Sequence, residues 1–336
     1  MTGGGSVMVF MLKIVGALMI SVLGVLIGLF YKGVDRKLAA MMQSRVGPPI
    51  RQPFLDFFKL MIKENVVPEN AVPWVFNGAP VLALVSSITI LFYLPFASIP
   101  ALLGDSGDLI LIAYLLAIPA VALVVGGFSS GSPYASIGAQ REMVMMMSYE
   151  LPLVTTIIAL GWRLSLQQPG LNVFSLETLS ANPIWGMVGP LGFIGAIFLL
   201  FTLAIVTPAE LSIVPFDIPE AETELAGGIL VEYSGRNLAL FELANAVKMI
   251  VMAALTVILF FPYNISHLLS VSGVLAGIID LLFFLVKLFI VIFFEATYIR
   301  VAVARLKINQ ASVTYMFFLS VIGLIGLLFI AIDYII

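Results

Sequence analysis

Long apolar runs separated by short polar connections dominate this chain. Crossing a bilayer takes roughly 20 largely apolar residues in a helix, because hydrocarbon does not tolerate unpaired backbone groups. The pattern predicts an all-α polytopic membrane protein with eight transmembrane helices, in a single integral membrane domain over residues 1–336. The predicted spans are Val9–Tyr31, Ala79–Phe96, Leu109–Val125, Met143–Trp162, Trp185–Val206, Leu238–Phe261, Val271–Ile299 and Val313–Ile332.

The basic residues fall mainly on one face of the predicted bundle. Lys13 and Arg163 lie on the opposite face, whereas twelve of the 16 lysines and arginines share the rich one: Lys32, Arg36, Lys37, Arg45, Arg51, Lys59, Lys63, Arg141, Arg236, Arg300, Arg305 and Lys307. Because basic residues concentrate in cytoplasmic loops, this face is predicted to be cytoplasmic, with both termini outside. Asp105 and Gly170 are then outside as well. The cytoplasmic loops cover about 32–77, 126–141, 207–237 and 300–312.

The first cytoplasmic loop contains a second kind of helical pattern. Between Pro53 and Glu64, apolar side chains follow helical spacing on one side and charged ones on the other. We expect an amphipathic helix here that lies along the membrane surface or under a partner.

Composition narrows the function classes. Hydrophobic residues make up 61% of the chain and charged residues 10%, and the net charge of −3 offers no basic surface for nucleic acid. There is no cysteine and a single histidine, His267, so thiolate metal sites and cysteine-ligated iron–sulfur clusters are excluded. Any redox cofactor is expected in other subunits, and neither a catalytic residue nor a metal site is assigned to this chain.

Several ionisable side chains fall inside or at the ends of predicted spans. They are Glu142, Glu150, Glu242, Lys248, Asp280, Lys287 and Glu295. An ionisable group in hydrocarbon costs at least ~2.5 kcal/mol, so each should be paired, neutral or beside a hydrated path. For any one of them, a charge at a helix end that reaches the interface explains the position equally well. Asp280 and Lys287 lie two helical turns apart, where pairing would need a bridging water.

Acidic residues are densest in the loop after the fifth span, Thr207–Asn237. It contains Glu210, Asp217, Glu220, Glu222, Glu224 and Glu232 against Arg236. On a continuous helix Glu220 and Glu224 would stand one turn apart, raise each other's pKa and share a proton. A helix dipole would also favour acids there, while a metal site lacks accompanying histidine or calcium-loop spacing. Gly227 and Gly228 predict a hinge or a close backbone approach.

Four segments carry a family resemblance. PFDIPEAETELAGGILVEYSG at Pro215–Gly235 resembles the hallmark of subunit 1 of respiratory complex I, the membrane subunit that anchors the peripheral arm, and of its relatives in energy-converting hydrogenases. Gly126–Leu153, Arg45–Glu64 and Arg300–Ala311 are similar to that family's other cytoplasmic loops. The resemblance covers essentially the whole chain.

The resemblance implies a coupling role in a multi-subunit, redox-driven pump for protons or sodium. The residues that match the acids of the family's ion path are Glu142, Glu150, Glu210, Asp217, Glu220, Glu222, Glu224 and Glu232. We add Lys248, Asp280 and Lys287 to this path only because they are charged residues inside predicted spans. The docking surface for the peripheral arm would use Arg45, Pro48, Pro49, Gln52, Phe54, Phe57, Phe58, Arg141 and Arg236. The implied partners are peripheral iron–sulfur and hydrogenase-like subunits, antiporter-like membrane subunits and ferredoxin as electron donor, in a prokaryotic cell membrane.

One departure bears on the electron acceptor. Quinone-reducing members carry a longer connection after the first Gly-Pro, whereas here Gly47–Pro53 is compressed, which resembles membrane-bound, ferredoxin-dependent hydrogenases. We therefore expect hydrogen evolution or reduction of sulfur compounds, with iron–sulfur clusters, and in a hydrogenase a nickel–iron centre, in partner subunits. Quinone reduction is the alternative. A stand-alone secondary transporter is disfavoured by the lack of internal repeats, and a purely structural anchor by the charges within spans.

Overall fold

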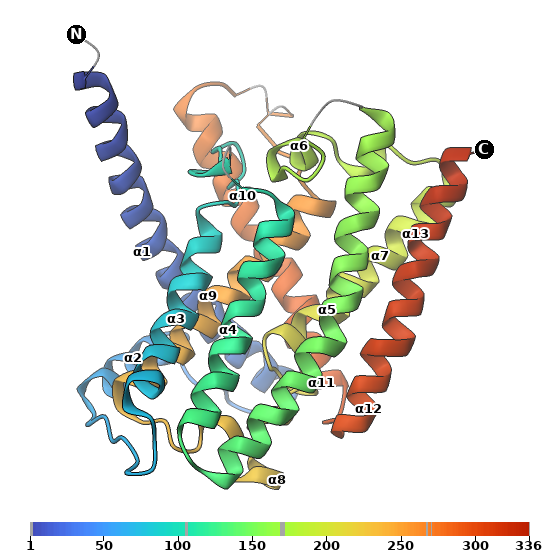
Figure 1. Cartoon of the computed structure of the whole chain (residues 1–336). Helices are drawn as coiled ribbons and strands as arrows, with labels where there is room; N and C mark the ends of the chain where they lie inside the picture. Colours follow the sequence, from blue (N-terminus) through green and yellow to red (C-terminus); the bar gives the residue numbers. More distant parts are fainter. Residues whose placement is uncertain (1–2, 105–106, 169–171, 267, 270, 336) are drawn as a thin grey trace.

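The computed structural model describes residues 3–104, 107–168, 172–266, 268–269 and 271–335, and apart from one isolated β-bridge their regular secondary structure is helical. Within them, eight helices are long and apolar enough to cross a membrane, so the predicted fold class is confirmed (Figure 1). Asp105, Gly170 and His267, named above, lie outside the described residues. The spans are α1 (Gly3–Met42), α3 (Pro73–Leu91), α4 (Leu109–Ser129), α5 (Pro133–Gln167), α7 (Pro190–Glu210), α9 (Gly235–Phe260), α10 with α11 (Val274–Ala302), and α12 with α13 (Ile308–Ile335).

Several spans extend beyond their apolar runs. Helix α1 continues to Met42, and α5 begins at Pro133, a residue suited to a helix start. The expected loop over 126–141 is therefore wrong: only Ser130–Ser132 connect α4 to α5. Hydropathy misses such ends because polar side chains are well tolerated on helix turns that protrude past the hydrocarbon.

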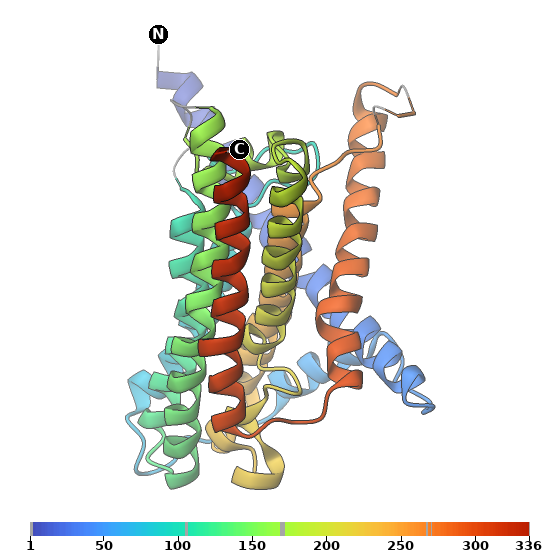
Figure 2. The same ribbon diagram turned by 90° about the vertical axis from the view of Figure 1, so that its right-hand side faces the viewer.

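Helix α9 is the central element of the bundle. It is buried along nearly its whole length and packs against α1, α2, α3, α7 and α10 (Figure 1). Helix α10, by contrast, stands at the side of the bundle (Figure 2) and buries few of its residues. A functional group on α9 is thus removed from lipid on every side.

The predicted surface helix is α2 (Gln52–Ile62). Phe54 and Phe57 pack against α1 and α9, while the Phe58 side chain is 61% exposed. Arg36 donates to Asp56 at 3.1 Å and holds α2 to α1. Part of the apolar face of α2 therefore packs within the chain, and part of it is exposed.

Both termini lie at one end of the bundle (Figure 1). There, Arg163 of α5 donates to Asp333 of α13 at 3.2 Å, and both side chains are buried. Asp333 also accepts from the amide of Gly189 at 2.8 Å. This ion pair joins the last span to the middle of the chain.

The acidic loop is packed at the opposite end. Tyr233 stacks on Phe76 of α3 with ring centroids 4.2 Å apart and donates to its carbonyl at 3.2 Å. Gly228 has φ +53°, and a Cβ there would overlap the carbonyl oxygen of Pro219, so the close backbone approach is confirmed. The loop is therefore fixed against the bundle.

Candidate functional site: a buried row of charged residues

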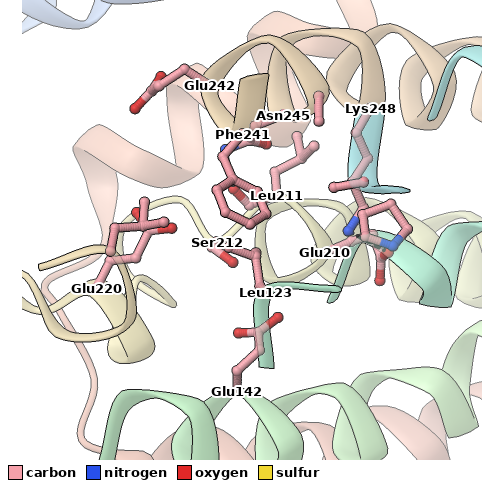
Figure 3. A pocket seen from close by; sticks show the side chains of 14 residues that line it. Leu123, Glu142, Glu210, Leu211, Ser212, Glu220, Phe241, Glu242, Asn245 and Lys248 are labelled. Carbon is pink, nitrogen blue, oxygen red and sulfur yellow. Dashed lines mark hydrogen bonds and ion pairs between the residues drawn. The ribbon is translucent and has the colours of Figure 1, made fainter. Parts of the chain in front are cut away.

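Charged side chains from four segments meet in a small central cavity. Glu142 comes from α5, Glu210 from the end of α7, Glu220 from the 3₁₀ turn Ile218–Glu220, and Glu242 and Lys248 from α9 (Figure 3). The cavity has a volume of about 40 Å³, which holds roughly two or three waters. The structure thus brings together Glu142, Glu210, Glu220 and Lys248, all predicted from the sequence.

A buried ion pair forms one end of this row. Lys248 Nζ lies 2.8 Å from Glu210 Oε1, and the side chains are 7% and 2% exposed. Tyr149 of α5 is fully buried beside Glu210. Glu142 lines the same cavity and is also buried, so one cation faces two carboxyl groups.

Glu220 forms the other end of the row. Its pKa is raised to about 8, first by burial and then by the nearby acids Glu242 and Glu142, while Lys32 opposes the rise. A carboxyl group with such a pKa exchanges its proton near neutral pH. Glu220 is therefore suited to accept and release a proton.

A second, larger cavity of about 340 Å³, called the inner cavity below, is also lined by Glu220 and Glu242, at the end of the bundle opposite the termini. Lys32 of α1 pairs with Glu242. Arg305, in the connection between α11 and α12, donates to Asp217 at 2.9 Å, which raises the pKa of Arg305. The acidic loop and the last inner loop thus enclose this cavity together, and Glu222 lies at its edge.

The expected proton-sharing pair of Glu220 and Glu224 is wrong. Ala221, at φ −58° and ψ 100°, interrupts the helix between the 3₁₀ turn and α8 (Glu222–Leu225). Glu220 therefore faces the cavity, while Glu224 is exposed and pairs with Arg141 at 2.5 Å.

Glu150 extends the row sideways. It lies two helical turns after Glu142 on α5 and is within electrostatic reach of Glu210. Together with Ile110 and Tyr114 of α4 it lines a mainly apolar groove of about 390 Å³. Glu150 thus lines a groove that shares no lining residue with the central cavity.

Asp280 and Lys287 are placed away from the central cavity. Asp280 accepts from the amide and hydroxyl of Ser266 at 2.9 and 2.8 Å. Lys287 donates to the carbonyls of Phe261 and Tyr263 at 2.8 and 2.9 Å, at the end of α9. Asp280 and Lys287 make no direct ion pair in the structure, because each side chain bonds to the α9–α10 connection, although Asp280 is near enough to act on Lys287 electrostatically. Glu232 also does not line the central cavity.

The residues predicted to dock the peripheral arm gather at the end of the bundle opposite the termini. Arg45, Pro49, Phe58 and Arg236 are exposed, and Pro48, Gln52 and Arg141 are half-buried. Phe54 and Phe57 pack within the chain, as described above.

Sequence reasoning missed two buried polar groups near the row. Asp35 of α1 accepts from Thr297 at 2.7 Å and from Arg300 at 2.9 Å, and Tyr149 is buried near Glu210. Glu295, which the sequence placed inside or at the end of a span, is 3% exposed. Nothing in the sequence indicated that Asp35 is buried, because it lies among the basic residues that follow the first predicted span.

A cleft between α1, α2 and α9 borders the row. Leu29, Phe57 and Leu243 form apolar walls, and Lys32 and Arg36 are among the polar ones, around a volume of about 250 Å³. An apolar cleft with a few polar groups is the usual form of a small-molecule site. Among the described residues, no group of three histidine or acidic side chains is arranged to hold a metal ion.

Within the described residues, a helical bundle with eight candidate membrane spans encloses a row of charged side chains, which defines the chain as a polytopic membrane protein. The chain belongs to the NADH dehydrogenase family of membrane subunits, whose family model matches residues 14–331. It is a subunit of a complex I-like respiratory oxidoreductase.

Two similar curated relatives are subunits of NADH-quinone oxidoreductases. The protein of Brevibacillus brevis is 33% identical over 82% of this chain and 79% of its own length. That of Anoxybacillus flavithermus is 33% identical over 86% of each chain. A chain of the membrane-bound sulfane sulfur reductase, an archaeal respiratory membrane complex, superposes with a TM-score of 0.81 at 27% identity, over 95% of this chain and 99% of that one.

Proposed function

We propose that this chain couples electron transfer in a peripheral arm to ion translocation through the row from Glu220 to Glu142, Lys248 and Glu210. The supporting observation is that Glu220 and Glu242 line both the inner cavity and the central cavity. A change of charge in the inner cavity therefore acts directly on the buried acids, because Coulomb interactions are strong where water is scarce.

The row is tested with carboxyl-to-amide replacements in the assembled complex. Glu220→Gln keeps shape and most hydrogen bonds but removes the titratable proton. In sealed membrane vesicles, ion pumping should fall by about tenfold or more, while electron transfer within the peripheral arm continues. Glu177→Gln, on the short helix α6 (Leu176–Ala181), is the matched control. Full pumping by Glu220→Gln would reject the proposal.

For the electron acceptor, a quinone is the interpretation that the comparisons favour over the expected hydrogen or sulfur chemistry. The curated relatives are subunits of NADH-quinone oxidoreductases. The cleft between α1, α2 and α9 supports this, because its apolar walls and its basic residues Lys32 and Arg36 suit a ring with a long apolar tail and polar carbonyl oxygens.

Reduction of a sulfur compound is the second candidate. It is supported by the likeness to the sulfane sulfur reductase chain and by the compressed Gly47–Pro53 connection. In either case the redox cofactors belong to partner subunits that dock near Arg45, Phe58 and Arg236 at the cytoplasmic face of a prokaryotic membrane.

Purification of the complex from native membranes distinguishes the acceptors. A quinone-type complex should reduce a short-chain quinone with NADH or reduced ferredoxin, and Phe57→Trp should raise the KM for quinone by obstructing the cleft. A sulfur-type complex should reduce polysulfide but not quinone. Hydrogen evolution together with bound nickel would instead support the hydrogenase interpretation.

A further inference from the structure

Glu295 is a buried acid outside the row described above. It lies in the π-helical turn Phe293–Tyr298, which interrupts the span between α10 and α11. The side chain is 3% exposed, and its Oε2 has no hydrogen-bond partner among the described residues. Such π-helical turns widen a helix locally and occur often at functional sites.

Two threonines face this carboxyl group. Thr207 of α7 and Thr256 of α9 lie beside Glu295. Each hydroxyl already donates its proton to its own helix, Thr207 to Leu203 O at 3.0 Å and Thr256 to Met252 O at 3.3 Å. While these bonds to the helix are made, the threonine oxygens have lone pairs that can accept a hydrogen bond from Glu295.

The threonine oxygens can accept a hydrogen bond from a protonated Glu295, which would donate its O–H. A carboxylate only accepts hydrogen bonds, so either threonine would have to give up the bond to its own helix in order to donate to it. Because Oε2 is buried without a partner among the described residues, the site favours a protonated acid.

Two charge pairs lie on the helices around this turn. Asp35 of α1 accepts from Arg300 of α11, and Glu210 of α7 pairs with Lys248 of α9. None of these pairs gives Glu295 a counter-charge. Unpairing of Lys248 would change that, because it would leave a mobile cation on the helix that carries Thr256.

The two threonines connect Glu295 to the row. Thr207 precedes Glu210 by three residues on α7, a spacing at which side chains are about 5–6 Å apart between Cβ atoms. Thr256 lies eight residues after Lys248 on α9, on the same side of the helix. A proton leaving Glu295 therefore has a polar approach to the Lys248–Glu210 pair.

We propose that Glu295 is a proton-binding residue that exchanges its proton with the Lys248–Glu210 pair during each pumping cycle. This inference rests on the proposed coupling function and adds a side branch to the row. The branch ends in the π-helical turn, so a shift of that turn between α and π geometry would move the acid toward or away from the threonines.

The test combines infrared difference spectroscopy with pumping by the assembled complex. The wild-type complex should show the carbonyl band of a protonated carboxyl group that changes on addition of the electron donor and depends on pH. Glu295→Gln should abolish this band and lower pumping by about tenfold or more, whereas Glu177→Gln should do neither. Thr207→Val should shift the band by removing the acceptor, which keeps the proposal testable if Glu295→Gln fails to assemble.

Three results would overturn the inference. They are a Glu295 band that stays constant during turnover, a band that responds to added sodium rather than to pH, or pumping by Glu295→Gln equal to that of Glu177→Gln. If Glu220→Gln loses pumping while Glu295→Gln retains it, only this inference fails. If Glu220→Gln also retains pumping, the row itself is wrong.

Discussion

Lys248 and Glu210 form an ion pair at 2.8 Å in the interior of the bundle, where both side chains are almost fully enclosed. Removing one partner of a buried pair leaves the other charge uncompensated, which costs about 3–5 kcal/mol. Lys248→Met and Glu210→Gln should therefore each lower the thermal unfolding midpoint of the complex. The double variant should recover most of the loss, and equal stability of both single variants with wild type would contradict the pair.

Glu220 should make stability depend on pH. Its pKa is raised to about 8 in the folded protein from an ordinary value of 4.5, so the folded state binds a proton more tightly than the unfolded state. Proton binding by Glu220 therefore stabilises the folded protein. This contribution is complete below about pH 4.5 and is lost as the pH rises through about 8. Glu220→Gln should remove this slope, as measured by unfolding midpoints of the complex from pH 5 to 9. A wild-type midpoint that rises over this range would contradict the assignment.

Glu224 should be dispensable for pumping. Its pair with Arg141 is exposed to water, and such pairs contribute about 0–1 kcal/mol. Glu224→Gln should retain stability and pumping near the wild-type level, in contrast to Glu220→Gln measured in the same vesicles. Loss of pumping in both variants would restore Glu224 to the ion path.

The Arg163–Asp333 pair should anchor the last span. Asp333→Ala removes the partner of a buried guanidinium and the acceptor for the Gly189 amide, so a loss of about 3–5 kcal/mol is expected. Limited proteolysis should then cleave near α13 earlier than in wild type. Asp333→Asn, which retains an acceptor oxygen, should show an intermediate effect.

The orientation in the membrane can be tested with single cysteines, because the chain has none of its own. Val46 and Val274 are strongly exposed at opposite ends of the bundle. The excess of basic residues at the inner end predicts that Val46→Cys reacts with an impermeant maleimide only from the cytoplasmic side, and Val274→Cys only from outside. Reversed labelling would overturn the topology.

The sequence predicted those features that depend on local composition. Eight apolar runs identify eight spans, and the ionisable residues in or at the ends of these runs include Glu142 and Lys248, while the density of acids after the fifth span points to Glu210. What it could not predict depends on interruptions of helices. The break at Ala221 separates Glu220 from Glu224, and the π-helical turn directs Glu295 inward, where a regular helix suggested an interfacial position. Contacts between distant segments, such as Arg163 with Asp333, leave no local trace in the sequence.

The backbone contact between Gly228 and Pro219 has a mechanical meaning. It fastens the turn that carries Glu220 to the segment that ends in Tyr233, and Tyr233 is stacked on α3. The segment that carries Glu220 is therefore braced by the backbone on one side and by α3 on the other. If a peripheral subunit binds the exposed helix α8, we expect any displacement there to reach Glu220 through this contact, without a rearrangement of the spans.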